Sequence, residues 1–144
     1  MSKKTFLAFL DITIVEIISQ KNQTKLMKDY LKDLNGEVIF YSTESYLTIE
    51  TLRLLESKIS EKIKINGIIF YSALQFSYSG KFLFETAKKI LKNKYEIYFM
   101  REDIKIKNID ELNNIKTSLK IFPDTHYDLI KNLKKNFYRI IEVK

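Results

Sequence analysis

The chain has 144 residues, of which 45% are hydrophobic and 30% are charged, and its formal net charge is +7. This balance fits one globular domain spanning residues 1–144 and excludes a disordered chain, because 10 Phe and 9 Tyr supply bulky apolar side chains. With no Cys and one His, the sequence excludes a disulfide scaffold, an iron–sulfur cluster, a cysteine nucleophile and a multi-histidine metal centre.

The positive charge is spread along the whole chain. Only three of the 25 basic residues are Arg, and the densest Lys clusters fall on predicted outer helix faces, so we expect solvated surfaces instead of a nucleic-acid track. The apolar run Phe6–Leu10 is too short for a signal sequence, and no stretch approaches the ~20 apolar residues of a membrane span. We therefore expect a cytoplasmic protein that does not insert into membranes.

Short apolar runs alternate with longer amphipathic stretches, which is typical of buried parallel strands covered by helices. The predicted strands are Thr5–Asp11, Glu37–Ser42, Gly67–Ser72 and Tyr95–Met100, with a weaker fifth near Leu119–Phe122. Right-handed crossovers then give an α/β fold, a Rossmann-like three-layer αβα sandwich whose mostly parallel sheet has the order 2-1-3-4, with any fifth strand last. The residues expected to be buried in it are Ile39, Ile68, Ile69, Phe70 and Ile97.

The amphipathic stretches predict the helices that cover this sheet. The first runs from about Lys21 to a C-cap at Asn35-Gly36, where the left-handed backbone is tolerated. The others are predicted at Leu52–Ile63, at Leu83–Leu91 entered through Ser79-Gly80, at Ile109–Ile115, and from Pro123-Asp124 to Phe137.

Polar residues follow each predicted strand. Ligands of open parallel sheets bind outside the carboxyl ends of the strands, so these exit residues form the candidate site. They are Asp11 and Thr13, then Ser42, Thr43 and Glu44, then Tyr71, Ser72 and Gln75, and finally Arg101, Glu102 and Asp103. Each of them also suits a strand end that meets water or caps the next helix, and for any single residue this alternative stays open.

Other chemistries have weaker signals in the sequence. Asp11, Glu44, Glu102 and Asp103 would hold Mg²⁺ only if their loops converged, and independent surface acids are the other interpretation, so we predict no metal and no cofactor. Three isolated glycines form no phosphate-binding loop. Asp11-Ile12-Thr13 lacks the second aspartate of the haloacid dehalogenase start, and His126 has no evident nucleophile to serve as its partner.

Three stretches of the chain carry a family resemblance. They are Ser19–Gln23 with Lys28-Asp29-Tyr30, then Tyr41–Glu44, and then Asn66–Gln75. Together they resemble the sporadic carbohydrate cluster proteins, small bacterial proteins encoded among surface-polysaccharide biosynthesis genes. The resemblance runs from about Ser19 to Glu102, and the chain departs from it at Asp11-Ile12-Thr13, where the family has a Ser-Arg-Pro-like turn, and at Phe76-Ser77, where it has Pro.

More distantly, the layout resembles the catalytic domain of serine recombinases, including Gln23 and Glu102-Asp103. The nucleophilic Ser and the arginine cluster of those enzymes have no counterpart here, and Lys does not replace Arg in bidentate phosphate binding. This resemblance therefore implies a resolvase-like fold without DNA-cleaving activity.

The family resemblance implies a role in cell-surface carbohydrate biosynthesis, as an enzyme or enzyme subunit acting on a sugar or nucleotide sugar, although catalysis itself stays open. The predicted catalytic residues are Glu44, Ser72 and Glu102, and the predicted substrate-binding residues are Asp11, Thr13, Gln23, Ser42, Thr43, Tyr71, Gln75 and Arg101. The alternative is a non-catalytic accessory or binding protein with a dimerising, recombinase-like fold. The aromatic run Phe76, Tyr78, Phe82 and Phe84 is expected in the core, or else in an exposed patch that would support a homodimer.

Overall fold

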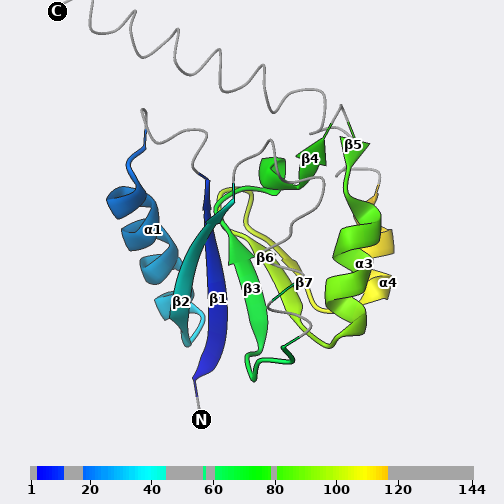
Figure 1. Ribbon diagram of the computed structural model, residues 1–144, viewed down its shortest axis with the longest axis horizontal. Coiled ribbons are helices and arrows are strands. Elements are labelled where there is room, and N and C mark those ends of the chain that lie inside the picture. The colour runs from blue at the N-terminus through cyan, green and yellow to red at the C-terminus, as the bar shows by residue number, and fades with distance from the viewer. Residues whose placement is uncertain (1–2, 12–17, 45–56, 58–60, 79–80, 117–144) are drawn as a thin grey trace, which may run out of the picture.

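The computed structural model describes residues 3–11, 18–44, 57, 61–78 and 81–116 (Figure 1). The elements in chain order are β1 (Lys4–Asp11), α1 (Gln20–Asp33), β2 (Gly36–Glu44), β3 (Gly67–Phe70), a 3₁₀ turn (Ala73–Phe76), β4 (Ser77–Tyr78), β5 (Lys81–Phe82), α3 (Phe84–Lys92), β6 (Glu96–Phe99), β7 (Ile104–Ile106) and α4 (Ile109–Asn114).

The main sheet has the order β2-β1-β3-β6-β7, and its first four strands are parallel, which confirms the predicted α/β fold and strand order. The fifth strand differs from the expectation, because β7 follows β6 through a tight turn and pairs antiparallel to it, with Phe99 opposite Ile104. The weak strand predicted near Leu119–Phe122 lies outside the described residues. Where the sequence predicted a helix entry, β4 and β5 instead form a separate two-stranded hairpin.

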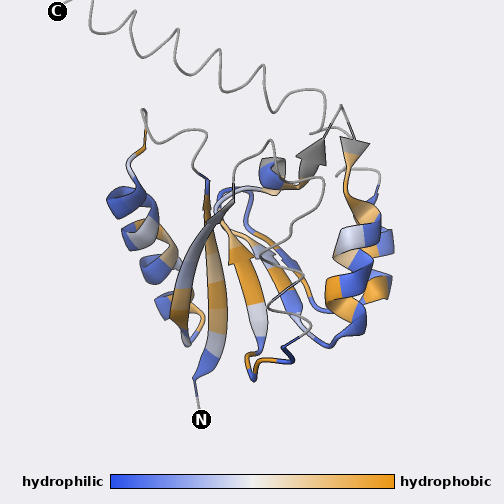
Figure 2. Ribbon diagram, viewed as in Figure 1, coloured by the Kyte–Doolittle hydropathy of each residue, from blue (hydrophilic) through white to orange (hydrophobic). Residues whose placement is uncertain are grey.

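Helices cover both faces of this sheet. Alternate residues of β1 point to opposite faces, so Phe6 and Ala8 pack with Met27 and Leu31 of α1, while Leu7 joins the cluster formed with α3 and α4. Figure 1 shows α1 on one side of the sheet and α3 and α4 on the other. Figure 2 shows apolar residues along the central strands and hydrophilic residues on the helices, so each helix buries one stripe.

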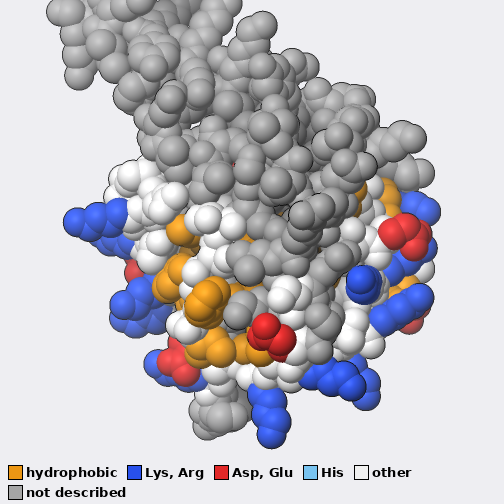
Figure 3. Space-filling view, viewed as in Figure 1, with side chains coloured by type: hydrophobic (Ala, Val, Ile, Leu, Met, Phe, Trp, Pro, Cys, Tyr) orange, Lys and Arg blue, Asp and Glu red, His pale blue; other side chains and the backbone are white. Residues whose placement is uncertain are grey.

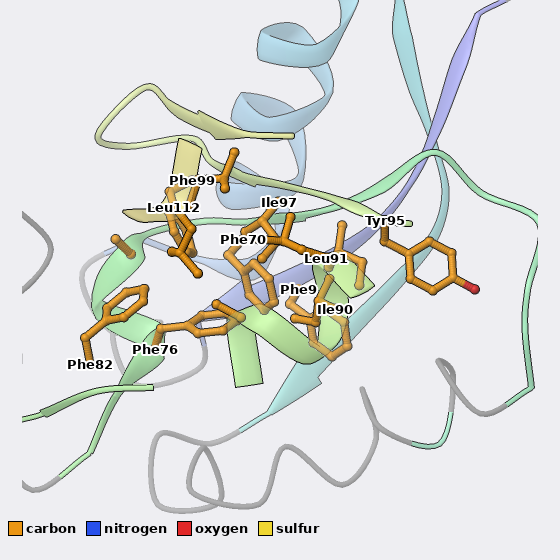
Figure 4. Packing of buried hydrophobic residues seen from close by; sticks show 14 of the residues in the cluster. Phe9, Phe70, Phe76, Phe82, Ile90, Leu91, Tyr95, Ile97, Phe99 and Leu112 are labelled. Carbon is orange, nitrogen blue, oxygen red and sulfur yellow. The ribbon is translucent and has the colours of Figure 1, made fainter. Parts of the chain in front are cut away.

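Aromatic rings fill the core on the α3 and α4 face (Figure 4). The Phe70 ring stacks on Phe9 with centroids 5.4 Å apart and meets Phe76 edge-on at 4.6 Å. Phe76 in turn stacks on Phe82 at 5.6 Å, and both are buried. Of the aromatic run after β3, Phe76 and Phe82 therefore belong to the core, Phe84 is half-buried, and the side chain of Tyr78 lies outside the described residues.

The prediction that Ile39 is buried is wrong, although the other four residues of that prediction are buried. Ile39 lies in β2, an outer strand of the sheet, and is 55% exposed. The register along β1 jumps there, with Phe6 opposite Val38 and Leu7 opposite Phe40, so Ile39 is the extra residue of a bulge. Figure 3 shows hydrophobic side chains gathered over this part of the molecule.

Three of the predicted helices are present as α1, α3 and α4, whereas Glu61 and Lys62, at the end of the stretch predicted as helical, form a turn with Lys62 in the left-handed region (φ 52°). Helix α1 begins one residue before the prediction, with the Ser19 hydroxyl accepting from Asn22 N–H at 3.2 Å, and the left-handed residue after it is Asn35 (φ 57°). Most of the helix predicted at 52–63 and all of the one predicted at 123–137 lie outside the described residues. Within the described part, every helix is too short or too polar to span a bilayer.

Candidate functional site

The end of β3 lies between the ends of β1 and β6, at the carboxyl edge of the sheet. Beyond the strand itself, Tyr71 N–H donates to Phe9 C=O at 3.2 Å, and Arg101 N–H donates to Tyr71 C=O at 2.9 Å. Three strands thus deliver their exit residues to one place, as expected for parallel neighbours about 5 Å apart. This juxtaposition brings Ser72 close to the turn that follows β6.

Ser72 and Glu102 form a direct contact at this edge. Ser72 Oγ donates to Glu102 Oε2 at 2.6 Å, and the backbone N–H of Ala73 donates to Glu102 Oε1 at 2.8 Å. Ser72 is buried and Glu102 is half-buried. The carboxylate is therefore oriented by two donors, one of which is a backbone group that holds it in place.

The Gln75 side chain folds back onto the same strand ends. Its Oε1 accepts from Ser72 N–H at 2.9 Å, and its Nε2 donates to Phe9 C=O at 3.4 Å. Gln75 is buried, and both ends of its amide contact backbone groups. The sequence predicted Gln75 as a substrate-binding residue, whereas its observed contacts hold β3 against β1.

Gln23 makes a similar contact from α1. Its Oε1 accepts from Asp11 N–H at 2.8 Å, and its Nε2 donates to the carbonyls of Asp11 at 2.8 Å and Ile18 at 3.0 Å. The side chain is completely buried. Gln23 was also predicted to bind substrate, but in this structure its amide joins the end of β1 to the start of α1.

Three charged residues act electrostatically on the hydroxyl of Tyr71. Burial raises the pKa of Tyr71, the Arg101 guanidinium opposes that rise, and the Asp11 and Glu102 carboxylates add to it. Asp11 is buried, 3% exposed, at the end of β1. Acidic, basic and phenolic groups therefore share the carboxyl edge.

The turn that carries Arg101 and Glu102 is fixed from two sides. Asp103 N–H donates to Met100 C=O at 3.0 Å, which closes a four-residue turn, and Asp103 adopts the left-handed region (φ 54°). Tyr30 of α1 donates its hydroxyl to Asp103 Oδ1 at 2.6 Å. Burial and Asp103 raise the pKa of Tyr30, so the phenol keeps the proton that it donates.

The remaining predicted site residues are only partly described. Ser42 is half-buried and Thr43 exposed near the end of β2. The backbone of Glu44 pairs with Asp11, at the same edge as Ser72, but its side chain is outside the description, as are Thr13 and His126. Within the described residues, no three acidic or histidine side chains are grouped so that they could hold a metal ion.

Sequence reasoning gave no site role to Tyr30 or to the N–H of Ala73, and it placed Asp103 at this edge without identifying its partner. Tyr30 belongs to a stretch singled out by resemblance, and its three-residue spacing from Met27 places it near the buried stripe of α1. Its contact with Asp103 joins residues 73 positions apart, which no local pattern reveals. Comparisons with models of known protein families and with curated protein sequences found no match.

Taken together, the carboxyl edge presents an oriented carboxylate, a serine hydroxyl and an arginine. A general base must lie within hydrogen-bond reach of the group that it deprotonates, and Glu102 meets this geometric condition. Ser72 provides a hydroxyl already at that distance. The arrangement suits chemistry on hydroxyl groups, with the carboxylate as base and the serine as relay or hydrogen-bonding partner.

Proposed function

We propose that this protein is an enzyme, or an enzyme subunit, that acts on a sugar or nucleotide sugar in cell-surface carbohydrate biosynthesis. In this proposal Glu102 is the general acid/base, Ser72 and Tyr71 hydrogen-bond substrate hydroxyls, and Glu44 remains a second candidate acid. The observation that carries the proposal is the 2.6 Å contact between Ser72 Oγ and Glu102 Oε2.

The chemistry of that contact favours a hydroxyl-bearing substrate. A sugar hydroxyl is the same kind of donor as Ser72 Oγ–H, so it can occupy the same carboxylate oxygen or be relayed through the serine. The Ala73 N–H keeps the other oxygen in position, which limits the reorganisation needed when substrate binds. Sugars also need several directional donors and acceptors, which this polar edge supplies.

The biological setting rests on resemblance. The segments that resemble the sporadic carbohydrate cluster proteins include Tyr41–Glu44 and Asn66–Gln75, and both run into the carboxyl edge described above. The residues with the most specific resemblance thus coincide with the part of the fold where polar side chains meet.

The alternative function, a non-catalytic binding protein that forms a homodimer, draws on a different observation. Leu26 and Ile39 are large apolar side chains that are 46% and 55% exposed. Exposed apolar side chains near an outer strand suit a protein partner. This alternative predicts that changes at Glu102 leave function intact, whereas changes at Ile39 do not.

The test combines ligand binding with turnover. Wild type, Glu102→Gln and Ser72→Ala would be incubated with a panel of nucleotide sugars, with Glu37→Gln, an exposed acid on β2, as the matched control. We expect a thermal shift and a new product by mass spectrometry for wild type and control, and loss of product for the other two. Each variant's shift is measured from its own melting temperature.

Surface glycan in the producing strain provides an independent measurement. We expect it to be lost when Glu102→Gln replaces the wild-type protein and to be retained with Glu37→Gln. No shift with any nucleotide sugar, together with normal glycan in the Glu102→Gln strain, would rule out the enzyme.

A further inference from the structure

Arg101 lies beside the candidate site and is the one arginine among the described residues. It is the second residue of the turn between β6 and β7, and its backbone N–H contacts Tyr71 C=O at 2.9 Å, immediately before Ser72. Its side chain is exposed. Arg101 therefore comes directly before Glu102 on the same turn, and its backbone is hydrogen-bonded to the residue that precedes Ser72.

The acidic neighbours of Arg101 contact other groups. Glu102 accepts from Ser72 Oγ and Ala73 N–H, and Asp103 accepts from the Tyr30 hydroxyl and lies 3.9 Å from Lys105 Nζ. Within the part of the chain that the structure describes, the Arg101 side chain has no hydrogen bond or ion pair. Its planar set of donors is therefore available to an anion from solution.

The guanidinium is also electrostatically coupled to the site. Its charge acts on the Tyr71 hydroxyl against the charges of Asp11 and Glu102. A ligand that brought negative charge here would meet repulsion from those two carboxylates unless a cation held it. Arg101 is the described cation in the right place, and arginine binds phosphate through two parallel hydrogen bonds.

We propose that the ligand of this site is a phosphorylated sugar, and that Arg101 binds its phosphoryl group while the sugar hydroxyls face Ser72 and Glu102. This inference rests on the proposed function and narrows its substrate class. Two adjacent residues of one turn would then bind the two ends of the ligand. Arg101 would hold the phosphoryl group, and Glu102 would contact the sugar hydroxyls.

The experiment measures dissociation constants by calorimetry for glucose 1-phosphate, UDP-glucose, glucuronic acid, glucose and inorganic phosphate. Arg101→Gln removes the guanidinium, and Arg101→Lys keeps the charge without the bidentate geometry. Lys107→Gln is the control for net charge, because Lys107 follows β7 beside Glu96 at the opposite edge. Circular dichroism establishes that each variant is folded.

We expect wild type to bind at least one of the phosphorylated sugars, and Arg101→Gln to weaken that binding by about tenfold or more, because a hydrogen bond to a charged group is lost. Arg101→Lys should lie between the two, and Lys107→Gln should match wild type. Glucose binding, where detectable, should be the same in all four proteins.

Three outcomes would overturn the inference. If glucose binds as tightly as its phosphate and Arg101→Gln changes neither, the site takes neutral sugars, and the proposed function stands. If glucuronic acid replaces the phosphorylated sugars as the Arg101-dependent ligand, the anion is a carboxylate. If no sugar of any kind binds, the narrower inference and the proposed function both fail.

Discussion

Polar side chains are buried at the carboxyl edge of the sheet and more exposed at the amino edge. The described residues include four buried polar side chains, Asp11, Gln23, Ser72 and Gln75, and all four lie at the carboxyl edge. At the amino edge the polar contacts are more open: Lys4 Nζ meets Glu96 Oε2 at 3.0 Å with Lys4 41% exposed, and Asn66 accepts from Thr5 N–H.

The amino edge nevertheless contains a hollow of about 540 Å³, lined by Leu91, Lys94, Glu96, Lys107, Asn108, Ile109 and Asp110. The hollow lies at one edge and the buried polar side chains at the other, so a hollow alone is a weak indication of a functional site. Burying a polar group costs about 1–3 kcal/mol unless it is hydrogen-bonded, so buried polar side chains mark where a fold holds groups in fixed positions. By that measure the carboxyl edge is the ordered polar region of this molecule.

The largest expected effect is at the carboxyl edge. Replacing Gln23 with Ala leaves the Asp11 N–H and the carbonyls of Asp11 and Ile18 without their partner, so we expect unfolding free energy to fall by about 3 kcal/mol. Urea denaturation measures it. Gln20→Ala, an exposed glutamine in the same helix, is the matched control and should change stability by less than about 0.5 kcal/mol. Equal losses of stability in the two variants would show that the buried amide of Gln23 stabilises the fold no more than an exposed glutamine does.

A smaller effect is expected from close packing at the amino edge. A Cβ on Gly67 would lie 2.7 Å from the Glu96 carbonyl oxygen, so Gly67→Ala should cost about 2 kcal/mol as the strands separate. Gly36→Ala should cost less, because its nearest contact is a Phe6 ring carbon at 3.0 Å. Thermal denaturation of both variants provides the comparison. If Gly67→Ala lowered stability more than Gln23→Ala does, the amino edge would be the more sensitive of the two edges to substitution.

An effect no larger than that of Gly67→Ala depends on pH. Burial, with the nearby Glu96 carboxylate, raises the pKa of Tyr98 from 10 to about 12. The folded protein therefore holds this proton more tightly than the unfolded chain, and the resulting stability is complete below pH 10 and lost as pH approaches 12. We expect a loss of about 2 kcal/mol in unfolding free energy over that interval, measured by urea unfolding. In Tyr98→Phe this part of the pH dependence should be absent, and an unchanged profile would contradict the assignment.

Much of the fold could be predicted because its pattern is local. Continuous apolar runs such as Gly67–Phe70 are buried on both faces, and that alone identifies interior parallel strands. Ile39 was misjudged because a bulge shifts the register by one residue, and hydrophobicity does not reveal a bulge. The strand Ile104–Ile106 was missed because three residues with a central Lys carry too little periodicity.

The sequence predicted the edge of the sheet at which the candidate site lies, but not which of its residues contact one another. Strand ends placed Ser72 and Glu102 at the same edge, yet nothing in the sequence chose Glu102 over Glu44 as the carboxylate for Ser72. The backbone contacts of Gln23 and Gln75 could not be predicted, for a physical reason. A buried amide satisfies one donor and one acceptor of the backbone at once, and this depends on chain paths that local sequence does not encode.

The Gln23 amide has a consequence for how this protein could diversify. One side chain attaches Asp11 and Ile18 to the same helix, so the residues that flank positions 12–17 are held by a contact outside that stretch. A substitution at position 23 would release the end of β1 and the start of α1 together, and few other side chains carry a donor and an acceptor in one planar group. We therefore expect position 23 to vary less among diverging sequences than an exposed position of the same helix such as Gln20.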